Sequence, residues 1–149
     1  MDQIEVSNTV RKSWMSLLSK STAKELSALW TAFDASPAHQ LLRAPEIGSV
    51  MVQGRMGATG SGFNLGEVTI TRCSVRLHNA VDGHAYVQGR DKDKALQAAF
   101  IDALMQTDAA ERVQHDILDP LSRRAQTIRK DRAQKAAATK VDFFTLVRG

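Results

Sequence analysis

The sequence predicts an α+β fold, a two-layer domain with an N-terminal helical hairpin, an antiparallel β-meander and C-terminal helices. Two observations predict it. Residues Glu67–Leu77 follow the alternation of a strand, and short turn-rich links separate them from neighbouring apolar runs. The segments before and after these runs carry apolar residues at the three- and four-residue spacing of amphipathic helices.

Size and composition predict one soluble domain spanning residues 1–149. Its single cysteine, Cys73, excludes an internal disulfide framework and suits a reducing compartment. No apolar run approaches the ~20 residues of a membrane span. Because the N-terminus lacks the basic and apolar regions of a signal peptide, we expect a cytoplasmic location.

Two helices are expected at the N-terminus, joined as an αα-hairpin. The first spans Ser7–Lys20, and a capping box of Thr22 and Glu25 opens the second. Their apolar stripes contain Val10, Trp14, Leu17 and Leu18, then Leu26, Leu29, Trp30 and Phe33. Both tryptophans are therefore expected in the core.

Three strands are expected next, at Ile47–Arg55, Glu67–Leu77 and Ala85–Gln88. Proline disfavours helix in the residue before it, so Ala44–Pro45 is expected to be a break ahead of the first strand. The apolar parity of the second strand changes near Thr71. Either a bulge at this point or burial on both faces would explain the change.

The strongest helical pattern covers Asp91–Gln106, and this helix is expected to cover one face of the sheet. Asp108 and Glu111 form another capping box, and Asp119–Pro120 is expected to open a last helix. Residues 120–140 of that helix are basic, with a net charge of 7 − 1 = +6. The tail, residues 141–149, is unusually apolar for a terminus, and it would either add a strand to the sheet or dock on a partner.

The glycine-rich stretch Gly54–Gly66 holds five of the nine glycines. A P-loop would need Lys-Ser/Thr where Phe63-Asn64 stand, and a dinucleotide fingerprint would need a third glycine where Leu65 stands. Two interpretations stay open: a hairpin loop without a ligand, or a loop that contacts an anion. The candidates for such an anion site are Arg55, Gly57, Thr59, Gly60, Asn64, Arg72 and Arg90.

No catalytic set is evident. The four histidines and Cys73 lack metal-ligand spacing, so no metal site is expected, and Cys73 is expected to be a small buried side chain. The basic helix raises the alternative of a nucleic-acid-binding module, but it lacks interleaved aromatic residues. A second alternative is a self-sufficient enzyme that acts on a phosphorylated metabolite through the glycine-rich loop.

Nearly the whole chain also resembles the PhnG family of the bacterial carbon–phosphorus lyase system. The stretches that carry the resemblance are Arg11–Leu18, Leu42–Gly48, Arg55–Gly60, Thr69–Arg72, Val75–Leu77, Tyr86–Lys92, Ile101–Gln106 and Val141–Gly149. Each stretch is short, but their order along one chain makes the match specific.

The resemblance implies a cytoplasmic subunit of a hetero-oligomeric complex with PhnH, PhnI and PhnJ, assisted by PhnL, for phosphonate catabolism. It implies that the complex displaces adenine from Mg-ATP with an alkylphosphonate such as methylphosphonate. It also places the later carbon–phosphorus cleavage on PhnJ, with its iron–sulfur cluster and S-adenosylmethionine. No catalytic residue and no cofactor of its own is implied for this chain. A partner interface is expected at Phe143, Phe144, Leu146, Val147 and Arg148.

Overall fold

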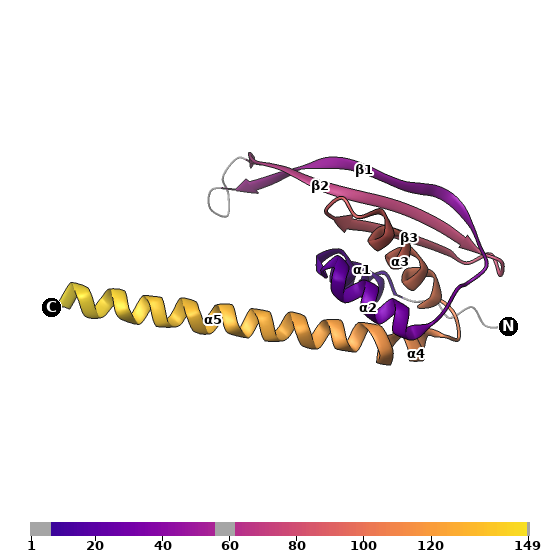
Figure 1. The fold of residues 1–149 in the computed structure, drawn as a ribbon. Helices are drawn as coiled ribbons and strands as arrows, with labels where there is room; N and C mark the ends of the chain where they lie inside the picture. The colour runs from indigo at the N-terminus through magenta and orange to yellow at the C-terminus, as the bar shows by residue number, and fades with distance from the viewer. Residues whose placement is uncertain (1–6, 56–61, 149) are drawn as a thin grey trace.

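A computed structural model describes the backbone of residues 7–55 and 62–148, and the side chains of residues 7–52 and 66–140 (Figure 1). The elements in order are α1 (Asn8–Lys20), α2 (Ala23–Phe33), β1 (His39–Arg55), β2 (Gly62–Leu77), β3 (Asp82–Gln88), α3 (Lys92–Leu104), α4 (Ala110–Val113), the π-helical turn η1 (Gln114–Leu118) and α5 (Asp119–Arg148). The predicted α+β class is confirmed.

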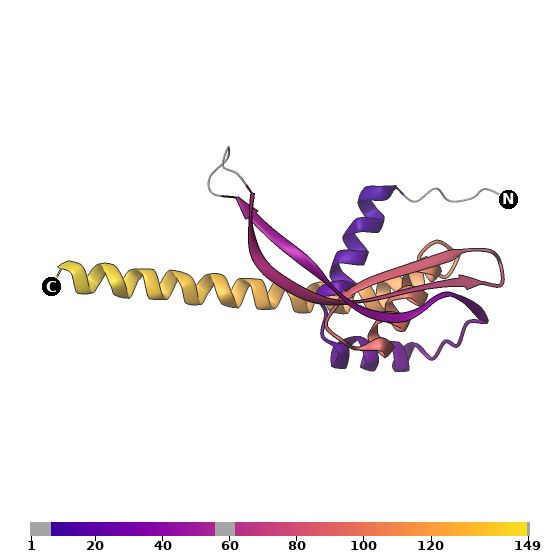
Figure 2. The ribbon, with the colours of Figure 1, turned by 90° about the horizontal axis from the view of Figure 1, so that it is seen from above.

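The three strands form one antiparallel sheet in the order β1-β2-β3. The helices α1, α2 and α3 lie on one face of it, as was expected for α3, and α5 runs beneath them and away from the body (Figure 1). Seen from above, the β1–β2 hairpin and α5 both extend beyond the body on the same side (Figure 2). The domain therefore has a packed base and two projections.

The first strand is longer than predicted. It begins at His39, and the expected break at Ala44–Pro45 is wrong. The register shifts between Leu41 and Arg43 and again between Arg43 and Glu46, so β1 passes the proline through bulges. Proline is tolerated here because β1 is an edge strand, where a missing backbone N–H removes no ladder bond.

The second strand also extends further than predicted. It starts at Gly62, so both ends of the glycine-rich stretch belong to the β1–β2 hairpin, and residues 56–61 lie outside the described residues. Its parity change is explained mainly by burial on both faces. The neighbours Ile70 and Thr71 are both buried, while the β2–β3 register is unbroken. The bulge lies instead in β1, opposite Cys73.

Helix α3 packs closely on β3. A Cβ on Gly83 would overlap the backbone oxygen of Ala99, so only glycine fits at this contact. The facing side of α3 is rich in alanine, with Ala95, Ala98, Ala99 and Ala103 buried. The larger Leu96 and Leu104 of the same helix are only partly buried. Small side chains let the helix approach the sheet.

Helix α1 begins one residue after the predicted start, and α2 begins after Thr22 as predicted. Ser7 caps α1 by accepting from the Val10 amide, and Thr22 caps α2 by accepting from the Glu25 amide. The Glu25 side chain pairs with Arg124 instead of completing the predicted capping box. The helices run in different directions (Figure 2), and each packs on α3. Trp14 is buried as expected, whereas Val10 is 53% exposed and does not join the core.

The C-terminal helices differ from prediction at their starts. Ala109, not Asp108, precedes α4, and Thr107 Oγ1 accepts from the Ala109 amide, so the expected Asp108 capping box is wrong. Asp119 has helical dihedrals, and its amide donates to the Gln114 carbonyl five residues back. It therefore continues a helix rather than capping one. The wider π turn comes just before Pro120, which has no N–H to donate.

The end of the chain is helical. Helix α5 continues through Arg148, so the alternative that residues 141–149 add a strand to the sheet is wrong. The side chains of residues 141–149 lie outside the described residues. Near its start, α5 is anchored by the buried Leu121, whereas residues 126–140 are exposed.

Candidate functional site

A buried carboxylate joins three elements of the domain. Asp102 of α3 is 0% exposed and accepts from Arg11 Nε (3.1 Å) and Nη2 (2.7 Å) on α1. It also accepts from Trp14 Nε1 at 2.8 Å and from the His84 amide of β3 at 2.8 Å. The hydrogen bonds between Arg11 and Asp102 raise the pKa of Arg11, against the opposing effect of partial burial. This cluster was not predicted from the sequence, where its one signal is an acidic residue within the apolar run of α3.

Side chains also occupy the outer edge of β3. Gln106 Nε2 donates to the Asp82 carbonyl at 2.9 Å, and the Asp102 carboxylate accepts a hydrogen bond from the His84 amide. Lys94 Nζ donates to Ser19 O at 2.9 Å and to Gln88 O at 3.4 Å. Burial lowers the pKa of Lys94, partly offset by the nearby carboxylate of Asp91. These side chains support the fold, because each forms a hydrogen bond with a backbone N–H or C=O group at the edge of a strand or the end of an element.

Charged side chains pair across the face of the sheet that the helices leave open. Glu46 of β1 lies 3.6 Å from Arg72 Nη2 of β2 and 3.3 Å from Arg43 Nη1. All three side chains are substantially exposed. Two arginines around one carboxylate leave a net positive charge, so this face suits an anionic or acidic partner.

Two further pairs lie along the same face toward the β2–β3 turn. Arg76 and Asp82 form a two-bond ion pair at 2.7 and 3.0 Å, which lowers the pKa of Asp82 and raises that of Arg76. Ser74 Oγ lies 2.9 Å from His84 Nδ1. Among the described residues no carboxylate is hydrogen-bonded to the His84 ring, so this pair does not complete a nucleophilic triad.

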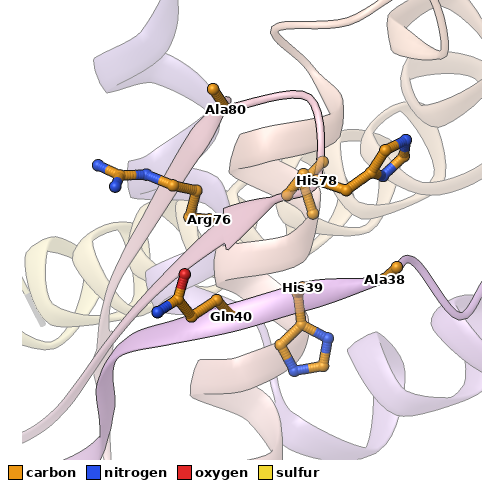
Figure 3. A pocket seen from close by; sticks show the side chains of 7 residues that line it. Ala38, His39, Gln40, Arg76, His78 and Ala80 are labelled. Carbon is orange, nitrogen blue, oxygen red and sulfur yellow. The ribbon is translucent and has the colours of Figure 1, made fainter.

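A shallow cavity of about 340 Å³ lies where β1 begins and β2 ends. It is lined by Ala38, His39, Gln40, Arg76, Leu77, His78 and Ala80. Figure 3 shows that the polar side chains diverge: the rings of His39 and His78 point away from Arg76. His39 stacks edge-on against Phe100 at 4.7 Å, and Arg76 is held by Asp82. The cavity therefore lacks a converging catalytic set.

The predicted anion-site residues are spread along the hairpin. Arg55 ends β1 opposite Gly62, whereas Arg72 lies opposite Glu46, nine residues back along β1. At about 3.3 Å per residue, the backbones of Arg55 and Arg72 are roughly 30 Å apart. Arg90 is exposed in the link between β3 and α3. Gly57, Thr59 and Gly60 lie outside the described residues, as do the side chains of Arg55 and Asn64.

Metal and thiol chemistry find little support in the described part of the chain. No group of three His, Cys, Asp or Glu side chains there is arranged to hold a metal ion. Cys73 is 1% exposed, as predicted, and burial raises the pKa of its thiol. Within the same residues, no helix is both long and apolar enough to cross a membrane.

The basic residues of α5 are displayed rather than buried. Arg124 reaches back to Glu25 of α2 at 3.0 Å, and Lys135 pairs with Asp131 within the helix at 3.3 Å. Further along, the described residues out to Lys140 are all exposed. The predicted interface residues Phe143, Phe144, Leu146, Val147 and Arg148 follow on the same helix, with side chains outside the described residues.

Comparison with known proteins identifies the family of this chain. A family model described as "Phosphonate metabolism protein PhnG" matches residues 9–149. The chain is also 44% identical, over 140 residues, to the alpha-D-ribose 1-methylphosphonate 5-triphosphate synthase subunit PhnG of Rhizobium meliloti (strain 1021). That alignment covers 93% of this chain and 89% of the relative. The chain therefore belongs to the PhnG family of phosphonate metabolism proteins.

Proposed function

We propose that this chain is a subunit of a carbon–phosphorus lyase complex, in which it supports transfer of the ribose triphosphate moiety of ATP to an alkylphosphonate with release of adenine. The observation that carries the proposal is its 44% identity to a relative named as a subunit of a ribose 1-methylphosphonate 5-triphosphate synthase. The partners are PhnI, PhnH and PhnJ, with PhnL, and the complex uses Mg-ATP. Family membership does not favour the alternative of a nucleic-acid-binding module.

Within that complex the chain has a structural or site-completing role. The described polar groups support this role because most of them hold the fold together. Asp102 is enclosed by its donors, Arg76 and Asp82 pair with each other, and Cys73 is buried. Arg72 is different, because it is exposed on the open face of the sheet and shares its carboxylate partner, Glu46, with Arg43.

The basic helix at residues 120–140 and the apolar tail at residues 141–149 form the proposed partner interface. Most helical stability in proteins comes from packing against other elements, so the exposed part of α5 gains most from a partner. Its net charge of +6 over residues 120–140 suits an acidic surface, and the apolar residues that follow suit a hydrophobic patch. The basic charge and the apolar tail therefore both favour a protein partner for this part of the chain.

Co-expression with PhnI and purification through a tag on this chain test the subunit proposal. Wild type is expected to retain PhnI in stoichiometric amount. The double variant Phe143→Ala and Phe144→Ala is expected to lose it, while alanine keeps the helix intact. Thr139→Ala, one turn earlier, is the matched control. Wild type that elutes without PhnI contradicts the subunit proposal; equal retention by all three chains contradicts only this interface.

Adenine release by the reconstituted complex tests the site-completing role. Arg55→Ala, Arg72→Ala and Arg90→Ala are each assayed with Mg-ATP and methylphosphonate, after assembly has been verified. The control for Arg72 is Glu46→Ala, which removes the same ion pair but keeps the arginine. A site-completing arginine gives a fall of about tenfold or more in its own variant only. Full activity in all three variants leaves a purely structural role.

A further inference from the structure

The two edges of the sheet differ. At β3, the side chains of Lys94, Asp102 and Gln106 form hydrogen bonds with the backbone groups that point away from β2. At β1, no hydrogen bond from another described residue reaches the outer backbone of Glu46–Val52. Natural proteins blunt exposed strand edges because an open edge pairs with another strand. This domain has closed one edge and left the other open.

The pairing pattern identifies the open groups. In an antiparallel pair, successive residues point their N–H and C=O groups alternately toward and away from the neighbour. His84 points outward on β3, so its neighbours Gly83 and Ala85 bond to β2. The registers of the β2–β3 and β1–β2 pairs extend this alternation to β1. There, the backbone N–H and C=O groups of Ile47, Ser49 and Met51 point away from β2.

The same three residues form a symmetric pattern. Ser49 lies midway between Ile47 and Met51, and the register is unbroken from Glu46 to Val52. Pro45 and the bulges lie outside this segment. The side chains of Ile47 and Met51 are 41% and 51% exposed, although both are large and apolar. Two copies that meet antiparallel at Ser49 would place each Ile47 beside Met51 of the other copy.

We propose that a second copy of this chain pairs with the first through β1, antiparallel and centred on Ser49, so that the two sheets become one. The pairing is isologous, since the same segment serves on both sides of a two-fold axis. It satisfies the outward groups of Ile47, Ser49 and Met51 in both copies and covers their apolar side chains. A foreign strand would satisfy the backbone equally well, but self-pairing also sets the exposed apolar side chains of Ile47 and Met51 against each other on both sides of the axis.

This inference goes beyond the proposed function and is tested on the chain alone. Sedimentation equilibrium is expected to show a twofold rise in mass from 16.3 kDa as concentration increases. The variant Ile47→Lys with Met51→Lys, and its counterpart with Glu at both positions, are each expected to remain monomeric through like-charge repulsion. Both positions are exposed, and circular dichroism checks that the fold is kept. Mixing the two variants is expected to restore the twofold mass.

A cysteine at the two-fold axis tests the register. Paired residues across an antiparallel ladder lie about 5.5 Å apart between Cα atoms, within disulfide range. Ser49→Cys is therefore expected to form a disulfide-linked dimer under mild oxidation, because the native Cys73 is buried and does not compete. Ser16→Cys, exposed on α1, is the control for random collision. A chain that stays monomeric at all concentrations, or equal cross-linking of both variants, overturns the proposal.

Discussion

Arg11 and Asp102 lie 91 residues apart in the sequence and meet in a two-bond ion pair at 3.1 and 2.7 Å. Through it α1 is tied to α3, and through the amide of His84 the same carboxylate ties α3 to the edge of β3. The carboxylate is fully buried, so its charge has to be balanced by these donors rather than by water.

Replacing Asp102 with Asn keeps the shape of the side chain but removes its charge and turns an amide NH₂ toward one of the donors. We expect the free energy of unfolding to fall by about 3 kcal/mol. Urea denaturation followed by tryptophan fluorescence measures it, since Trp14 bonds to this carboxylate. Asp108→Asn, at an exposed position, is the control. Equal stability of the two variants would contradict the structural role of Asp102.

Gly83 and Gly48 provide a matched pair of glycines. A Cβ at Gly83 overlaps the Ala99 carbonyl, whereas a Cβ at Gly48 meets nothing within 4 Å. We expect Gly83→Ala to cost about 3 kcal/mol of folding free energy, because α3 must move off the sheet. Gly48→Ala should change stability by no more than about 1 kcal/mol. Thermal denaturation of both variants checks the contrast, and similar melting temperatures would argue against the close approach of α3.

Lys94 predicts a pH dependence. Its pKa in the folded protein lies below 10.5, because burial disfavours the charged form. Between the folded and unfolded pKa values the unfolded chain binds more protons, so the free energy of unfolding rises with pH there. In Lys94→Met this contribution is absent, so the free energy of unfolding should rise less between pH 8 and pH 10 than in the wild type. Urea titrations of both proteins across that range measure the slopes; parallel slopes would show that Lys94 is not the cause.

Cys73 is expected to be unreactive in the native protein. It is buried in the core, and its thiol pKa lies above 9.0, so little thiolate forms at pH 8. Modification by a disulfide reagent should be roughly tenfold or more slower in the folded protein than in urea. The reagent releases a coloured thiol when it reacts, and the absorbance of this product over time gives the rates in the folded protein and in urea. Rapid labelling without denaturant would indicate that the sheet opens locally around Cys73.

Local signals in the sequence predicted much of the fold. The predicted cap at Thr22 acts within one helical turn, and its partner, the Glu25 amide, is nearby in sequence. Pro45 shows where local rules fail: its effect depends on whether β1 is an edge or a central strand, which the pattern of one segment does not contain. Asp108 has the residue type of a helix cap, but Thr107 provides the hydrogen bond.

The candidate site was harder to predict for a related reason. Arg55 and Arg72 flank the same glycine-rich stretch in sequence, yet the extended hairpin separates them. By contrast, Arg11, Asp102 and His84 are distant in sequence and converge only after the helices pack on β3. Their contact depends on the tertiary arrangement, and the family resemblance carried no residue role that would have indicated it.

The unbroken helical path from α4 through η1 into α5 has a mechanical consequence. Val113, Ile117, Leu118 and Leu121 hold the near end in the core, and the rest of α5 extends from it as a lever. Thirty residues at 1.5 Å each give an arm of about 45 Å, so a tilt of ~5° at the anchor displaces the far end by about 4 Å. A slight repacking around Ile117 is thereby amplified into a displacement large enough to alter contacts at the opposite end of α5.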